Sequence, residues 1–292
     1  MGALHLAAAT RRNVRAALDG GLRTAVLPLG ATEQHGEALP FGTDTVVGEE
    51  IALAFADRID ALLLPAMPFG LSMEHMSIPG TLTLRAETYV CFVREVVESL
   101  VFNGFDRVVL LVSHLGNLGA ADMAAEDVVS RTGAIVCVTS VFSGMQQAAG
   151  EILGLGPDEL DWAFFDSHGG AAEAAMVLAG GGFIDAAAAT SGSPSRPSVF
   201  YDRAMKYPQF VEERSPTGHW GDPLCVTPGD DTVVDAALGR RLIDACAKGL
   251  SERFLTVVNQ VQAGRAESPP NHPAANWRAR GAVTDMAAGR RP

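Results

Sequence analysis

The sequence has 292 residues, 48% of them hydrophobic, which is enough for one substantial buried core and at most two. Its formal net charge of −12 argues against nucleic acid as a partner, because phosphate binding needs clustered lysine and arginine. No apolar run approaches the roughly 20 residues that span a bilayer, so we expect no membrane partner. The apolar patch at 3–9 precedes its arginines, the wrong order for a signal peptide. Four widely spaced cysteines without a CxxC pair favour a reducing, cytoplasmic location.

Segments typical of strands and of helices alternate along the chain. Strands are bounded, β-branched or apolar runs, and helices show amphipathic spacing. This alternation predicts an α/β fold, with a mostly parallel sheet covered by helices on both faces. The predicted strands are 24–29, 61–67, 107–113 and 134–141, and the predicted helices are 45–59, 87–102, 117–132, 170–179 and 232–262.

Two segments depart from this alternation. Residues 182–230 are rich in glycine, serine and proline and are too long for a simple connector, which indicates a role in function or assembly. Residues 264–292 carry four prolines and five arginines against two acids. We therefore predict a single domain over residues 1–263, followed by a Pro/Arg-rich C-terminal tail. The tail is expected to be disordered, or to lie on the acidic body or on a neighbouring subunit.

The segment TEQHGEALPFGTD, residues 32–44, concentrates metal-competent side chains between a predicted strand and a predicted helix. In open α/β sheets, ligands bind in such loops at the carboxyl ends of strands. Glu33 and His35 are two residues apart, so an extended backbone points both to one side, which suits one metal or two adjacent metals. Asp44 can bridge two ions, or it can cap the helix that follows. Glu33 can equally be a solvated loop acid.

Two later segments add candidates. His114 follows a buried predicted strand and so lies at the ligand-binding edge of the sheet; alternatively, it is a core histidine satisfied by the backbone. Asn117 is interpreted as the N-cap of the next helix. His168 precedes two glycines, which let a substrate or a metal approach the backbone closely. Glu173 lies on an alanine-rich helix, where burial is costly unless the carboxylate is paired or bound to a cation.

These candidates combine imidazole and carboxylate groups. Such a donor set suits Zn²⁺, Mn²⁺ or Fe²⁺, whereas Ca²⁺ prefers oxygen alone. A bound ion of this kind lowers the pKa of water and polarises a carbonyl group. His168, outside the ligand set, can pass a proton to a leaving amine. The pattern predicts metal-assisted hydrolysis of an amide-like bond, with these candidate ligands: Glu33, His35, Asp44, His114 and Glu173.

Five blocks of the sequence resemble, in order, motifs of the creatininase family, the creatinine amidohydrolases and their relatives. LPLGATEQHGEALPFGTD is similar to the family's opening block, PFGLSMEHMSIPGTLTL to its second and VSHLGN to its third. SHGGAAEAA and TGHWGDP resemble its two later blocks, so the resemblance runs from about residue 24 to residue 245. It implies a three-layer α/β/α sandwich, a site for one or two divalent ions, most readily Zn²⁺, a small-molecule substrate, and a homo-oligomer, with a hexamer favoured.

Carried over by position, the resemblance also implies residue roles. His168 would be the proton-transfer residue, and Asp44 would bridge the ions. Trp220 would line the substrate site, although it can equally be a buried packing residue. The implied metal ligands are Glu33, His35, Asp44, His114 and Glu173. The implied substrate-binding residues are His75, Leu115, His219 and Trp220.

The sequence departs from the family pattern where creatinine hydrolases enclose their substrate. Gly116 stands in place of a glutamate and Leu115 in place of an aromatic residue, while Ser113, Ala171 and Ala174 replace glycine, glutamate and threonine. We therefore expect a metal-dependent amidohydrolase of a small cyclic amide, a formamide or a similar C–N bond other than an ordinary peptide bond, and not of creatinine itself. The alternative is a non-hydrolytic metal enzyme of the same fold, an amide-forming cyclase, a lyase or an isomerase. A metal-stabilised protein without catalysis is the third possibility.

Overall fold

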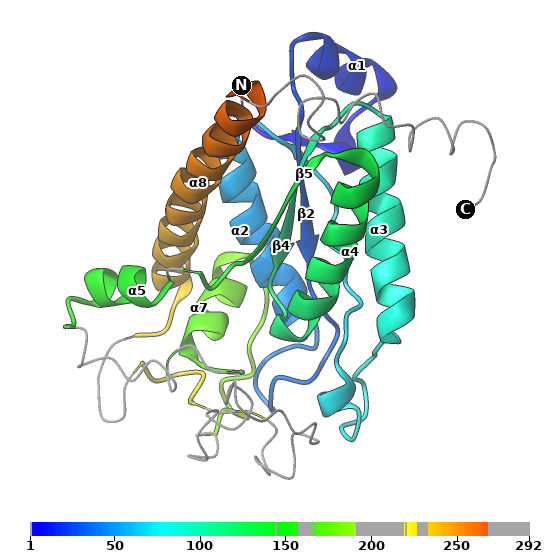
Figure 1. The fold of residues 1–292 in the computed structure, drawn as a ribbon. Helices are drawn as coiled ribbons and strands as arrows, with labels where there is room; N and C mark the ends of the chain where they lie inside the picture. The colour runs from blue at the N-terminus through cyan, green and yellow to red at the C-terminus, as the bar shows by residue number, and fades with distance from the viewer. Residues whose placement is uncertain are drawn as a thin grey trace.

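The fold, given by a computed structural model, is a parallel β-sheet between two layers of helices (Figure 1). The structure describes residues 2–143, 145–156, 165, 168–190, 219, 221–226 and 233–267. Trp220, most of the predicted 182–230 segment and the tail from residue 268 lie outside this part of the chain. The predicted α/β/α class is confirmed. The strands are β1 (Leu4–His5), β2 (Thr24–Leu29), β3 (Leu62–Leu63), β4 (Arg107–Val112) and β5 (Ile135–Ser140).

The sheet has the strand order β1-β3-β2-β4-β5, and all four of its strand pairings are parallel. The two central strands β2 and β4 pair in register from Thr24 with Arg107 to Leu29 with Val112. Their carboxyl ends therefore lie side by side. The strand predicted over 61–67 is shorter than expected, with Met67 joining β2 only through an isolated bridge. Pro65 lies between, and proline cannot donate a ladder hydrogen bond.

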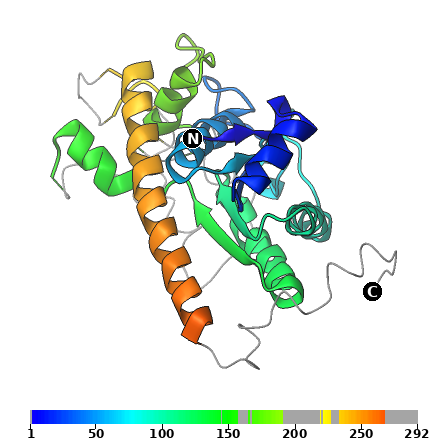
Figure 2. The same cartoon turned by 90° about the horizontal axis from the view of Figure 1, so that it is seen from above.

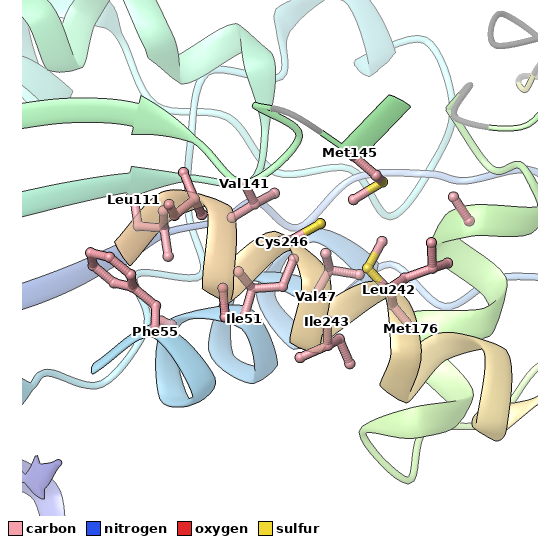
Figure 3. Packing of buried hydrophobic residues seen from close by; sticks show 14 of the residues in the cluster. Val47, Ile51, Phe55, Leu111, Val141, Met145, Met176, Leu242, Ile243 and Cys246 are labelled. Carbon is pink, nitrogen blue, oxygen red and sulfur yellow. The ribbon is translucent and has the colours of Figure 1, made fainter. Parts of the chain in front are cut away.

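Helices α2 (Thr43–Ile59), α5 (Met145–Leu153), α7 (Ala171–Ala179) and α8 (Ala236–Glu267) cover one face of the sheet. The stripe of α2 that includes Ile51 and Phe55 packs against Leu111 of β4 and Leu242 of α8 (Figure 3). These side chains are at most 1% exposed. Helix α8 continues to Glu267, so the first residues of the predicted tail are helical.

Helices α3 (Ala86–Phe102) and α4 (Leu118–Thr132) cover the other face of the sheet (Figure 2). Tyr89, Val93 and Val97 recur at every fourth position of α3, which places them on one side of the helix, and all three are fully buried. The sequence did not predict β1, α1 (Arg11–Asp19) or α5. No helix in the described part of the chain is both long and apolar enough to cross a membrane.

Asn117 connects the loops that carry the site. It occupies the N-cap position of α4, as predicted, but its side chain makes no capping hydrogen bond within the described residues. Its amide nitrogen donates to the carbonyl oxygen of Gly30, and its amide oxygen accepts from the backbone of Leu71. A Cβ at Gly70 would lie 2.5 Å from that oxygen, so only glycine fits. The fully buried side chain therefore joins the segments that follow β2, β3 and β4.

Candidate metal centre

The predicted metal ligands meet at the carboxyl edge of the sheet. Glu33 and His35 lie in the loop after β2, Asp44 in the first turn of α2, His114 directly after β4, and Glu173 in the first turn of α7. Each is between 1% and 6% exposed. Glu33 is therefore not a solvated loop acid. The N-cap of α2 is Gly42, so the alternative role of Asp44 as an N-cap is also wrong.

The ligand atoms fall into overlapping groups whose members lie within 4.8 Å of one another. Glu33, Asp44 and His114 form one group, and His35, Asp44 and Glu173 form a second. His114 Nδ1 lies 3.1 Å from Glu33 Oε1 and 3.7 Å from Asp44 Oδ2. His35 Nε2 lies 3.5 Å from Asp44 Oδ1 and 3.7 Å from Glu173 Oε2. The two oxygens of Asp44 therefore face different histidines.

Backbone carbonyl groups orient both of these imidazoles. His35 Nδ1 donates to the carbonyl oxygen of Glu33 at 3.0 Å, so Nε2 is the nitrogen that faces the carboxylates. His114 Nε2 donates to the carbonyl oxygen of Leu71 at 2.9 Å, so Nδ1 faces them instead. Histidines that bind metals nearly always donate their other ring N–H to such an acceptor. If His114 were only a core histidine satisfied by the backbone, the hydrogen bond of its Nε2 would be explained. The position of its Nδ1, which faces Glu33 and Asp44, would not.

Three atoms of the cluster are buried without a hydrogen-bond partner among the described residues: Glu33 Oε2, His35 Nε2 and Asp44 Oδ2. A buried polar atom left unsatisfied costs about 1–3 kcal/mol. The three residues belong to the two groups defined above, Glu33 and Asp44 to the first and His35 and Asp44 to the second, so one divalent cation at each group would supply partners for these atoms. The residues present therefore fit a metal of the kind that imidazole and carboxylate ligands bind.

The electrostatics of the cluster also favour a cation. Burial alone would lower the pKa of His35, but the carboxylates of Asp44 and Glu173 raise it to about 10. Burial opposes protonation of His114 as well, and there the Glu33 carboxylate raises the pKa to about 10. Burial raises the pKa of Glu173 to about 7, despite the opposing effect of His35. Three buried carboxylates thus draw positive charge onto the neighbouring rings, and metal binding would displace those protons.

His168 lies beside the cluster, with its ring stacked on His35 at a centroid distance of 4.2 Å. Its Nε2 is 2.6 Å from the carbonyl oxygen of Gln34, a distance that requires a donated proton. Nδ1 lies 3.7 Å from Glu33 Oε1. Burial and the neighbouring imidazoles hold the pKa of His168 well below its usual value. The ring is therefore neutral with a lone pair on Nδ1, which allows it to accept a proton or to join Glu33 and His35 as a third ligand group.

Comparison with known proteins identifies the family. A family model described as creatininase, creatinine amidohydrolase, matches residues 7–254 of the chain. The chain belongs to the creatininase family. The predicted resemblance is thus confirmed, and it extends over most of the described structure.

Three relatives align with shorter segments of this creatininase family member. A segment is 36% identical over 104 residues to the mycofactocin precursor peptide peptidase of Mycobacterium ulcerans (strain Agy99), covering 32% of this chain and 41% of that protein. Another is 29% identical over 113 residues to the creatinine amidohydrolase of Pseudomonas putida, covering 37% of this chain and 44% of that protein. A third is 27% identical over 90 residues to the 3-dehydro-scyllo-inosose hydrolase of Thermotoga maritima, covering 30% of this chain and 29% of that protein. The chain therefore spans less than half the length of these relatives.

Solved creatininase structures share the fold. One crystal structure of creatinine amidohydrolase has a TM-score of 0.68 at 22% identity, covering 86% of this chain and 96% of that chain. A mutant creatininase of the Zn–Zn type has a TM-score of 0.70 at 20% identity, covering 87% and 98%. The structure named "Creatininase Mn" has a TM-score of 0.69 at 21% identity, covering 86% and 97%. At such identities the likeness concerns the fold.

The departures from the creatininase pattern have a structural reason at Gly116. A Cβ there would lie 2.4 Å from His114 Nε2 and 2.5 Å from the carbonyl oxygen of Leu71. Any side chain at this position would therefore displace the hydrogen bond that orients His114. A glutamate at position 116 would not fit unless His114 or Leu71 moved.

The predicted substrate-binding residues differ in accessibility. Leu115 is 38% exposed beside His114 and is available to a substrate. His75 and His219 are only 4% and 2% exposed. His219 Nε2 contacts the carbonyl oxygen of Thr190. The His219 ring occupies the space that a Cβ at Gly36 would take, and its Cβ lies where a Cβ at Gly169 would clash. Trp220 lies outside the described residues. Direct substrate contact by these side chains stays a prediction.

Gln34 is a site residue that the sequence did not predict. It is 2% exposed and lies between the rings of His75 and His168, within 3.1 Å of each. A neutral amide is not one of the residue types that sequence analysis considers as metal ligands or bases, so nothing marks Gln34 as a site residue. The alternation of side chains in an extended segment would place Gln34 on the side opposite Glu33 and His35, so this spacing gives no indication of its role either.

Proposed function

We propose that this protein is a metal-dependent hydrolase that cleaves an amide-type C–N bond in a small molecule. The observation that carries the proposal is the pair of ligand groups sharing Asp44, with three of their buried atoms lacking hydrogen-bond partners among the described residues. Glu33, Asp44 and His114 would hold one divalent ion, and His35, Asp44 and Glu173 a second. Zn²⁺ fits this donor set best, with Mn²⁺ or Fe²⁺ as alternatives. The relatives named as amidohydrolase and peptidase support amide chemistry.

When bound, such ions act as Lewis acids that polarise a carbonyl group and lower the pKa of water. The protein's own residues supply the remaining requirements. The carbonyl oxygens of Glu33 and Leu71 fix the two ligand imidazoles, which keeps the donor atoms preorganised. His168, held by the Gln34 carbonyl oxygen with Nδ1 toward the cluster, would move the proton to the leaving nitrogen. This places His168 in the role of general acid–base.

The surface beside the centre favours a substrate with an apolar body. Exposed apolar side chains lie on the segments that follow β2, β3 and β4, and the segments after β2 and β4 also carry Glu33, His35 and His114. Leu115 and Gly116 replace the enclosing groups of creatinine hydrolases, so we propose a cyclic amide or formamide other than creatinine. A peptide substrate is the competing case, given the name of the first relative above. The exposed side chains are Phe41, Phe69, Met73, Met76 and Leu115, each 36–62% exposed.

Metal content tests the proposal. Protein purified without added metal is expected to contain one to two divalent ions per chain by elemental analysis. Adding Zn²⁺ or Mn²⁺ to chelator-treated protein should raise its melting temperature, since a ligand at 100 times its Kd contributes about 2.7 kcal/mol. The loaded enzyme should then hydrolyse at least one member of a panel of lactams, formamides and short peptides. Metal content near zero without stabilisation would exclude the proposal. Net condensation of an acid and an amine, with release of water, would favour the cyclase alternative.

We also propose a cytoplasmic hexamer. The family resemblance supports the hexamer, and the wide spacing of the four cysteines without a CxxC pair supports the cytoplasmic location. Light scattering at micromolar concentration should give about six times the chain mass of 30.6 kDa. If the tail crosses between subunits, deletion of residues 268–292 should lower that mass or the melting temperature. A wild-type monomer would contradict the assembly, and an unchanged truncated protein would exclude a role for the tail.

A further inference from the structure

His75 is a buried imidazole next to the ligand cluster that none of the ligand groups in the described residues includes. It ends the 3₁₀ turn η2 (Met73–His75) and is 4% exposed. Its Nε2 lies 3.4 Å from Glu33 Oε1, and its ring stacks on that of His168 with centroids 4.4 Å apart. A side chain this deeply buried against a carboxylate has little surface to offer a substrate.

Gln34 determines which nitrogen of His75 carries the proton. The backbone N–H of Gly36 donates to Gln34 Oε1 at 2.9 Å, which fixes the orientation of the amide. Gln34 Nε2, the donor end, lies 2.8 Å from His75 Nδ1, so Nδ1 accepts this hydrogen bond. In a neutral imidazole the proton is then on Nε2, which faces Glu33. The backbone turn at Gly36 thus controls, through two hydrogen bonds, the group presented to the carboxylate.

His75 faces only one of the two carboxylate oxygens of Glu33. Oε1 faces His75 Nε2 and His114 Nδ1, whereas Oε2 is buried without a hydrogen-bond partner among the described residues. When His114 Nδ1 serves as a ligand it no longer has a proton for Glu33, so His75 is the neighbour whose Nε2–H still faces Oε1, at an N···O distance of 3.4 Å. Donors beside a metal-binding carboxylate help to orient it.

We propose that Gln34 and His75 are positioning residues: Gln34 fixes His75 with its proton on Nε2, and that N–H holds the Glu33 carboxylate in the orientation that binds metal. This inference rests on the proposed metal centre, and it replaces the role of His75 as a substrate contact. It concerns the affinity and geometry of the ion rather than the chemistry of the substrate.

The test compares His75→Asn with His75→Gln in the full-length protein. The amide nitrogen of glutamine reaches the place of imidazole Nε2, whereas that of asparagine reaches only the place of Nδ1. Co²⁺ is titrated into chelator-treated protein and followed by its visible absorption. His75→Asn should weaken Co²⁺ binding by about 10–100-fold, the usual effect of losing such a partner. His75→Gln should stay within about threefold of the wild type.

Gln34→Met is the second variant, because it keeps the length of the side chain but removes the amide donor. Its Co²⁺ affinity should fall by about tenfold, and it serves as the deciding variant if circular dichroism shows that His75→Asn is unfolded. The inference would be overturned if His75→Asn and Gln34→Met both bind Co²⁺ with wild-type affinity. It would also be overturned if His75→Gln binds Co²⁺ as weakly as His75→Asn does. A raised KM with unchanged Co²⁺ affinity would restore the substrate role. If the wild type itself binds no Co²⁺, the proposed function fails instead.

Discussion

Replacing Asp44 with alanine is expected to remove both metal ions, because Asp44 belongs to both ligand groups. Each group should lose at least about 100-fold in affinity, since even an outer partner of a metal contributes 10–100-fold. His114→Ala removes a member of one group and Glu173→Gln a member of the other, so each should retain at most one ion. Elemental analysis gives the stoichiometry for the three variants, and activity should be lost together with the metal.

Glu37→Gln is the matched control for these substitutions. Glu37 lies on the same loop as Glu33 and His35, but it is exposed and outside the ligand groups of the described residues. It removes one negative charge near the site without removing a ligand, so metal content should match that of the wild type. If Asp44→Ala keeps as much metal as Glu37→Gln, the shared-carboxylate arrangement is wrong.

The features of the site that could be predicted are those that follow from local geometry and sheet topology. Glu33 and His35 could be paired because alternate residues of an extended segment share a side. His114 could be added because parallel strands end at one edge, and β2 and β4 indeed lie side by side. Glu173 could be added because a buried carboxylate on an alanine-rich helix needs a partner. The structure brings these residues together, while their roles as ligands stay predictions.

The features that could not be predicted depend on contacts between loops. Gln34 and Asn117 are neutral amides, and their importance comes from the loops and rings they join rather than from their own charge. His75 comes from the second block of the family resemblance, but its position against Glu33 depends on how the segment after β3 folds over the first loop. The strand β1 has only two residues, too few for a periodic pattern to show.

His168→Ala is expected to retain its metal and to lose about 10²–10⁴ in turnover, the usual contribution of general acid–base catalysis. Its Nδ1 faces Glu33 at 3.7 Å while Nε2 is held by the Gln34 carbonyl oxygen, so the ring is oriented toward the cluster. His168→Gln keeps a donor for that carbonyl oxygen but cannot accept a proton near neutral pH. It should therefore be as slow as His168→Ala. Metal content beside turnover, on whichever amide proves active, is the measurement.

Free imidazole in solution distinguishes proton transfer from a packing role. It should restore part of the rate of His168→Ala, because it can enter the space of the deleted ring and accept the proton, but it should not restore Asp44→Ala. The structure also allows the opposite outcome, since His168 forms a ligand group with Glu33 and His35. If His168→Ala loses metal as His114→Ala does, then His168 is a ligand. In that case the proton must be moved by a group other than His168, because an Nδ1 lone pair bound to metal cannot also accept a proton.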